Sequence, residues 1–133
     1  MELNPEEAMV SAFIGKDKRD RYLAFLGSAK GRKKLRDMMA HGTVSHLNPA
    51  TMKSIPPKDH NVEGIYALLK SRGAPDLCRV ISEDARIDGR DMPLREALEA
   101  TVGAGMGTLI GCVPGRLAYF EGEDVATRFL LEK

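Results

Sequence analysis

The sequence predicts an α+β fold, in which three to four N-terminal helices pack with a small mixed sheet of four strands in the order β-α-β-β-β. In the first half, apolar residues recur at every third or fourth position, which is typical of helices. In the second half, short apolar runs alternate with Gly and Pro turns, which is typical of strands. The length of 133 residues fits a single domain over 1–133, with possible sub-lobes at 1–60 (helical) and 61–133 (mixed sheet).

Three helices are predicted before residue 43. Asn4 is a suitable N-cap for the first, with a proline at its opening position, and Gly15 ends it. The second starts near Asp17. Ser28 then caps a third, which ends at Gly42, because glycine adopts the backbone conformation that closes many helices.

A connection and a fourth helix follow. The Asn-Pro and Pro-Pro pairs at 48–49 and 56–57 interrupt any long helix, so 43–60 is predicted to be irregular. The fourth helix is predicted at 61–72, and Gly73 closes it. Its buried stripe consists of Val62, Ile65, Leu68 and Leu69.

The second half contains strands predicted at 77–82, 108–113, 117–120 and 127–131, and a helix at 94–102. Pro114-Gly115 is a suitable central pair for a type II turn, so the two strands around it form a hairpin. If the strands at 77–82 and 108–113 lie parallel, the helix between them is a right-handed crossover. The later hairpins then extend the sheet in antiparallel fashion.

Composition narrows the class of protein. A hydrophobic share of 43% and a charged share of 29% are those of an ordinary globular chain. No apolar run approaches the roughly 20 residues that cross a bilayer, and the first residues lack the signal-peptide pattern, so we expect a cytoplasmic protein without a membrane partner.

The residue types that usually bind metals or form disulfides give little signal. Cys78 and Cys112 each lie in an apolar run, so buried unpaired thiols are expected, with a disulfide or a reactive thiol as the alternative. The three histidines have no zinc-site spacing. No metal and no cofactor is therefore predicted.

The most unusual segment is a glycine run with Gly103, Gly105 and Gly107. Glycines at alternate positions let a backbone approach a ligand or partner closely. The run follows a helix and precedes a strand, which is the reverse of the order in nucleotide-binding glycine loops. We predict a contact surface here, shared with the Glu83–Asp88 loop and with Arg116 if the sheet ends adjoin; the alternative is a helix end and a tight strand entry.

A second candidate is the acidic loop with Glu83, Asp84 and Asp88. It follows a predicted strand, and ligands often bind at strand ends in α/β sheets. Glu83 and Asp84 would do acid/base chemistry if they converged on a pocket, which would make the protein a small-molecule enzyme. No nucleophile motif surrounds them, so solvated turn residues are the alternative.

A third candidate is basic. Residues 1–60 carry a net charge of +4 and residues 61–133 a net charge of −3. Non-specific nucleic-acid binding would use the basic helices at 16–36. The candidate residues are Lys30, Arg32, Lys33, Lys34 and Arg36. A solvated helix face is the alternative.

Taken together, these patterns favour a small cytoplasmic binding or regulatory module over an enzyme. Its contact surface is predicted near Gly103–Gly107, and its partner is a protein or a small molecule. Nucleic-acid binding through 16–36 is the second hypothesis. A small-molecule enzyme that uses Glu83 and Asp84 is the third.

Overall fold

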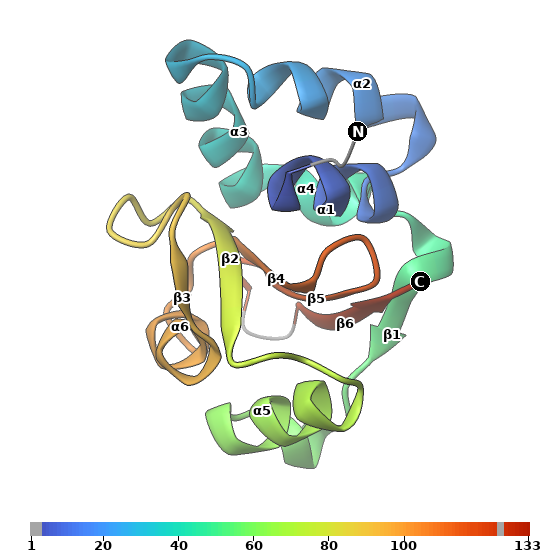
Figure 1. The fold of residues 1–133 in the computed structure, drawn as a ribbon, viewed down its shortest axis with the longest axis vertical. Helices are drawn as coiled ribbons and strands as arrows, with labels where there is room; N and C mark the ends of the chain where they lie inside the picture. The colour runs from blue at the N-terminus through green and yellow to red at the C-terminus, as the bar shows by residue number, and fades with distance from the viewer. Residues whose placement is uncertain (1–3, 125–126) are drawn as a thin grey trace.

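The computed structural model describes residues 4–124 and 127–133, and over these residues it confirms the α+β class (Figure 1). The helices are α1 (Pro5–Phe13), α2 (Lys16–Phe25), α3 (Ala29–His41), α4 (Thr43–His46), α5 (Val62–Ser71) and α6 (Leu94–Thr101), with short 3-10 turns at Pro49–Thr51 and Pro57–Asp59. The strands are β1 (Met52–Ser54), β2 (Leu77–Ser82), β3 (Asp91–Pro93), β4 (Thr108–Val113), β5 (Leu117–Glu121) and β6 (Arg128–Glu132). No helix in the described part of the chain could span a membrane.

The helix starts follow from side-chain capping. The side-chain oxygen of Asn4 accepts a hydrogen bond from the amide of Glu7 at 2.8 Å, and Ser28 accepts one from the amide of Gly31 at 3.0 Å. Each bond satisfies an amide that has no partner within the first turn of its helix. Both predicted caps are confirmed.

The strands form one antiparallel sheet in the order β1-β6-β5-β4-β2-β3. The predicted mixed sheet of four strands is therefore wrong in detail. β2 and β4 are antiparallel neighbours, with Ser82 opposite Thr108, and not the parallel pair of a crossover. The reason is β3, which brings the chain back to the start of β2, where Pro93 lies opposite Leu77. From there α6 leads to the other end of β2, so β4 has to run in the opposite direction to β2.

β1 and β3 are the strands that the sequence pattern did not predict. Each has three residues and lies at an edge of the sheet. β1 falls within 43–60, which was predicted to be irregular, and it extends the sheet through β6. Segments this short have no room for the alternation that indicates a strand.

The hairpin between β4 and β5 is confirmed. The amide of Arg116 donates to the carbonyl of Val113 at 2.9 Å, and Gly115 between them has a φ of 72°. A positive φ at the third position is what a type II turn requires.

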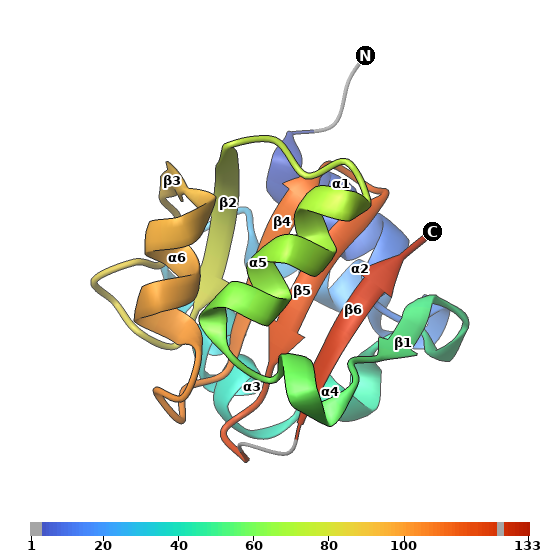
Figure 2. The ribbon, with the colours of Figure 1, turned by 90° about the horizontal axis from the view of Figure 1, so that it is seen from below.

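Helices cover both faces of the sheet. α1 to α4 lie on one face, and α5 and α6 lie on the other (Figures 1 and 2). The first cluster joins Phe13 and Leu35 to sheet residues such as Phe120. The second joins Leu69 and Leu98 to sheet residues such as Tyr119. Because the sheet is covered on both sides, its central strands are apolar on both faces.

Candidate functional site

The predicted site residues lie at two opposite ends of the sheet. We call one the Ser82 end, where β2 stops and β4 starts, and the other the Leu77 end, where β2 starts and β4 stops. Gly107 and Glu83 meet at the Ser82 end. Arg116 lies at the Leu77 end, in the turn after β4. The structure therefore brings the glycine run and the acidic loop together, and it leaves Arg116 a strand length away.

The glycine run makes contacts inside the fold. The amide of Gly103 donates to a carboxylate oxygen of Glu121 at 3.0 Å, and the amide of Gly107 donates to Glu83 Oε1 at 2.8 Å. A Cβ on Gly107 would lie 1.8 Å from the carbonyl oxygen of Met39, so only glycine lets α3 approach so closely. Gly103 and Gly105 have positive φ values of 80° and 71°. Helix packing and the entry into β4 explain most of these glycines.

A buried polar cluster, which the sequence analysis missed, holds one end of the run. Glu121 is fully buried, and its Oε1 accepts hydrogen bonds from the Tyr119 hydroxyl at 2.7 Å and from Arg128 Nε at 3.0 Å. Burial, followed by the bond to Glu121, raises the pKa of Tyr119. Glu121 and Arg128 face each other directly in neighbouring strands. The available signal was an acidic residue directly after the strand predicted at 117–120 and a basic residue within the strand predicted at 127–131.

The acidic loop is also internally bonded. The Asp84 carboxylate accepts hydrogen bonds from the side chain and the amide of Arg86, and the side-chain bond is the main reason why the pKa of Asp84 is lowered. Asp88 binds Arg32 through two bonds of 2.7 and 2.9 Å. Each of these carboxylates thus has its own cation.

The basic helix α3 divides into two groups of cations. Arg32 lies between Asp88 and Glu6, which it contacts at 2.6 Å, so this guanidinium is neutralised inside the fold. Lys30, Lys33 and Lys34 are exposed, and within the described residues they form no ion pair. The predicted basic set therefore supplies fewer free charges than its sequence indicates.

Arg36 is intermediate between these groups. Its Nη2 donates to the carbonyl of Glu83 at 3.3 Å, and its Nε lies 4.0 Å from Asp88 Oδ2. That Nε is buried and has no hydrogen-bond partner among residues 4–124 and 127–133. A buried donor without a partner is uncommon and costs stability.

Arg36 lines an open depression of about 390 Å³ between α3 and the start of the acidic loop. We call it the α3 depression. Its lining residues are Ala29, Arg32, Lys33, Arg36, Asp37 and Glu83. Residues from two of the three predicted sets therefore share one concave surface, and Gly107 of the third set supports it through Glu83.

Arg116 lines a different hollow, of about 240 Å³, together with Arg72, Lys133 and Glu132. Glu132 accepts hydrogen bonds from Lys53 at 2.6 Å and Arg72 at 2.8 Å. The bond from Lys53 is the largest cause of its lowered pKa, and Arg116 contributes through its charge. The side chains that line this hollow carry a net positive charge.

The histidines lie apart from one another. His41 contacts Glu123, His46 hydrogen-bonds to Tyr22, and His60 hydrogen-bonds to the carbonyl of Ile55. In the parts of the chain that the structure describes, no three His, Cys, Asp or Glu side chains gather to hold a metal ion.

Comparison with other proteins assigns no family. No protein-family model matches the chain, and no curated protein or solved structure is significantly similar to it.

Proposed function

We propose that this protein is a non-catalytic binding module and that its α3 depression holds a small molecule with a carboxylate or phosphate group. The observation that supports the proposal best is the position of Arg36, a partly exposed cation that lines the depression and has no carboxylate of the described residues within hydrogen-bond distance. An anionic oxygen in the α3 depression would accept hydrogen bonds from the accessible side of this guanidinium.

The charges around the depression favour one end of such a ligand. Arg32 is already paired with Asp88 and Glu6, so Arg36 and the exposed Lys33 are the cations that remain for an anion. Planar guanidinium groups bind carboxylate and phosphate well, because their N–H donors match the oxygen spacing.

Acidic residues favour a second group on the same ligand. Glu83 Oε1 accepts the amide hydrogen of Gly107, and Asp37 also lines the depression. Carboxylates repel a bare anion but accept hydrogen bonds from N–H or O–H groups. The proposed ligand therefore carries an anionic group together with an amino or hydroxyl group, as amino acids and sugar phosphates do.

Binding is a better fit than catalysis. The Asp84 carboxylate is tied to Arg86, and its lowered pKa makes it a weak general base. Glu83 is bonded to Gly107 and not to Asp84. The enzyme hypothesis needs these two carboxylates to act together, and their separate partners give it no support.

The proposal is tested by following amide chemical shifts of the labelled protein during titration with inorganic phosphate and with serine phosphate. We expect the Kd to rise at least tenfold in Arg36→Ala, which corresponds to about 1.4 kcal/mol. Lys58→Ala is the matched control, because Lys58 is an exposed cation on the distant Pro57–Asp59 turn. Equal Kd values for the two variants, or no saturable shift at low salt, would contradict the proposal.

A second candidate function is non-specific nucleic-acid binding, and the exposure of Lys30, Lys33 and Lys34 favours it. Three unpaired cations on one helix are available to phosphates. A gel shift with random RNA or DNA should then disappear in the double variant Lys33→Glu/Lys34→Glu. Arg36→Ala should leave that shift intact, which separates this candidate from binding in the α3 depression. The absence of any shift at low salt would exclude it.

A further inference from the structure

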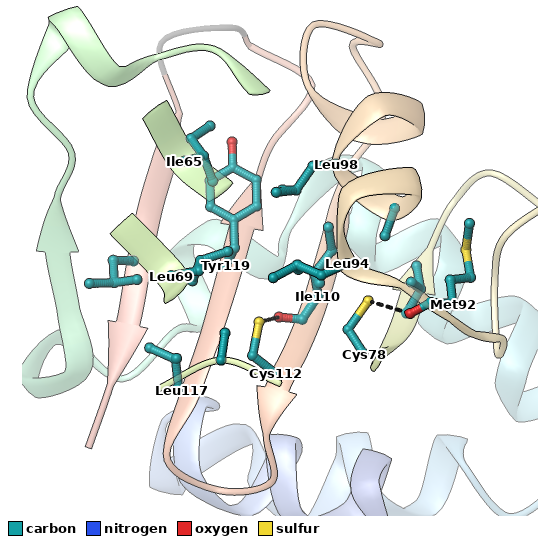
Figure 3. Packing of buried hydrophobic residues seen from close by; sticks show 14 of the residues in the cluster. Ile65, Leu69, Cys78, Met92, Leu94, Leu98, Ile110, Cys112, Leu117 and Tyr119 are labelled. Carbon is teal, nitrogen blue, oxygen red and sulfur yellow. Dashed lines mark hydrogen bonds between the residues drawn. The ribbon is translucent and has the colours of Figure 1, made fainter. Parts of the chain in front are cut away.

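Two cysteines at the Leu77 end point to a redox function. Cys78 on β2 and Cys112 on β4 are both buried in the cluster beneath α5 and α6. Figure 3 shows them at the same end of the sheet on adjacent strands, below Leu94. Each thiol points to a backbone carbonyl oxygen and not to the other sulfur.

The register of β2 and β4 leads toward the two cysteines. The paired residues end with Val80–Ile110 and Arg79–Gly111, and one step beyond this last pair the same register would set Cys78 opposite Cys112. The amide and carbonyl of Val80 both bond toward the β3 side, to Arg90 and Gly89. Residues two apart in a strand direct their backbone groups to the same side. Cys78 and Cys112 therefore occupy a site without backbone hydrogen bonds between the two strands.

This kind of site suits a disulfide. In an antiparallel pair, residues at a site without backbone hydrogen bonds have Cα atoms about 4.5 Å apart, closer than at the bonded sites. Disulfides span Cα distances of roughly 4.4–6.8 Å. β4 also has a register irregularity between Gly111 and Val113, which leaves Cys112 without a partner on β5. A bulge gives the strand local freedom to re-aim a side chain.

The present contacts of the thiols are weak. Cys78 Sγ lies 3.3 Å from the carbonyl oxygen of Met92, and Cys112 Sγ lies 3.9 Å from that of Ile110. Thiols are poor hydrogen-bond donors, so rotation of either side chain gives up little.

A groove borders the pair, in which Cys78 is 4% and Cys112 is 3% exposed. It has a volume of about 300 Å³, and both cysteines line it. Its other walls include Leu77, whose surface is 62% exposed, and the prolines Pro5, Pro75 and Pro114. A small disulfide molecule in this groove would lie next to both cysteines.

We infer that Cys78 and Cys112 are a redox-sensitive pair, which forms a reversible disulfide across β2 and β4 by exchange with a low-molecular-weight disulfide. One cysteine, as its thiolate, attacks a sulfur of the small molecule and breaks its S–S bond. One half of that molecule leaves and takes up a proton, while the other half stays on the protein as a mixed disulfide.

The second cysteine then completes the exchange. As its thiolate it attacks the protein sulfur of the mixed disulfide, forms the bond between Cys78 and Cys112, and releases the remaining half as a thiol. The protein loses two electrons and two protons, and the small disulfide gains both. A dithiol reductant reverses the reaction.

The burial of the two thiols sets the rate of the exchange. Loss of solvent is the main cause that raises the pKa of each thiol to about 12. The thiolate is the attacking species, so exchange is slow at neutral pH and accelerates as the pH rises. The pair therefore stays reduced unless the oxidant persists.

Oxidised glutathione tests the inference on the folded full chain. After several hours at mildly alkaline pH, we expect the intact mass to fall by two hydrogen atoms and a peptide map to show Cys78 linked to Cys112. Dithiothreitol should restore the original mass. Cys78→Ser and Cys112→Ser should each stop at a single glutathione adduct or stay unmodified.

Three results would overturn the inference. The first is a wild-type mass that does not change. The second is wild-type protein that keeps one glutathione on either cysteine without the internal link. The third is a disulfide that joins two chains. Far-UV circular dichroism before and after oxidation shows whether the fold is kept, and a link that forms only after the fold is lost would count as a failure.

Discussion

The two ends of the sheet use their polar and reactive groups differently. At the Ser82 end, Gly103 and Gly107 donate to the carboxylates of Glu121 and Glu83, and Glu121 also binds Arg128. At the Leu77 end, the thiols of Cys78 and Cys112 have only weak contacts, and the side chain of Arg116 has no hydrogen bond or ion pair within the described residues. The Ser82 end, which has the more unusual composition, thus uses these polar groups for contacts inside the fold. The plainer end keeps groups available for chemistry.

The largest effect that we expect concerns Glu121. Glu121→Ala should lower the free energy of unfolding by about 3–5 kcal/mol, because it leaves the Arg128 charge in a buried site without its partner. Glu132→Ala is the matched control, since Glu132 is a partly exposed acid in an ion pair on β6, and such pairs contribute up to about 1 kcal/mol. Urea unfolding measures both. Similar losses in the two variants would show that the Ser82 end does not depend on its buried cluster.

Substitutions at the first and the last glycine of the run should lower the free energy of unfolding by different amounts. Gly107→Ala should cost about 3 kcal/mol, because the new Cβ would overlap with the backbone of α3 at Met39. At Gly103 a Cβ meets no atom within 4 Å, so Gly103→Ala should cost only the strain of its positive φ, roughly 1–2 kcal/mol. Thermal or urea unfolding gives the comparison. A larger loss at Gly103 would mean that close packing of α3 is not what requires glycine at 107.

The Leu77 end should become more stable on oxidation. A disulfide between Cys78 and Cys112 restricts the unfolded chain and should add roughly 2 kcal/mol to the free energy of unfolding. The comparison is urea unfolding of the oxidised and the reduced protein, with Cys112→Ser taken through the same oxidation. A less stable oxidised protein would show that the link distorts β2 and β4.

The smallest effect that we expect is the change of the disulfide-exchange rate with pH. Because each thiol has a pKa of about 12, the thiolate fraction should rise about tenfold per pH unit, equivalent to about 1.4 kcal/mol. The rate of disulfide formation should therefore keep rising from neutral pH to about pH 10. A plateau near pH 8.5, the ordinary pKa of a cysteine, would indicate that the thiols react from an exposed state.

Much of the fold followed from local signals in the sequence. Asn4 and Ser28 identified helix starts, and Pro114-Gly115 identified the hairpin, because capping and turn geometry depend on a few neighbouring residues. Strand direction is a property of the whole chain. It depended on β3, whose three residues carry no periodic pattern, and so β2 and β4 were predicted to be parallel.

The site was harder to predict for a related reason. Sequence reasoning identified Arg32, Asp88 and Gly107, and it assigned Arg32 to a different candidate surface from the other two. Arg32 and Asp88 are in fact paired with each other across 56 positions of the chain. Composition shows which charges are present, and only the tertiary fold shows which of them neutralise one another.

The most direct test of the proposed binding function is the location of the chemical-shift changes when wild-type protein is titrated with serine phosphate. We expect the largest changes along Ala29–Asp37 and at Glu83, with only minor changes at Gly103 and Gly105, whose segment lies outside the α3 depression. Changes centred on Gly103 and Gly105, with α3 unaffected, would contradict binding in the α3 depression and return the contact surface to the glycine run.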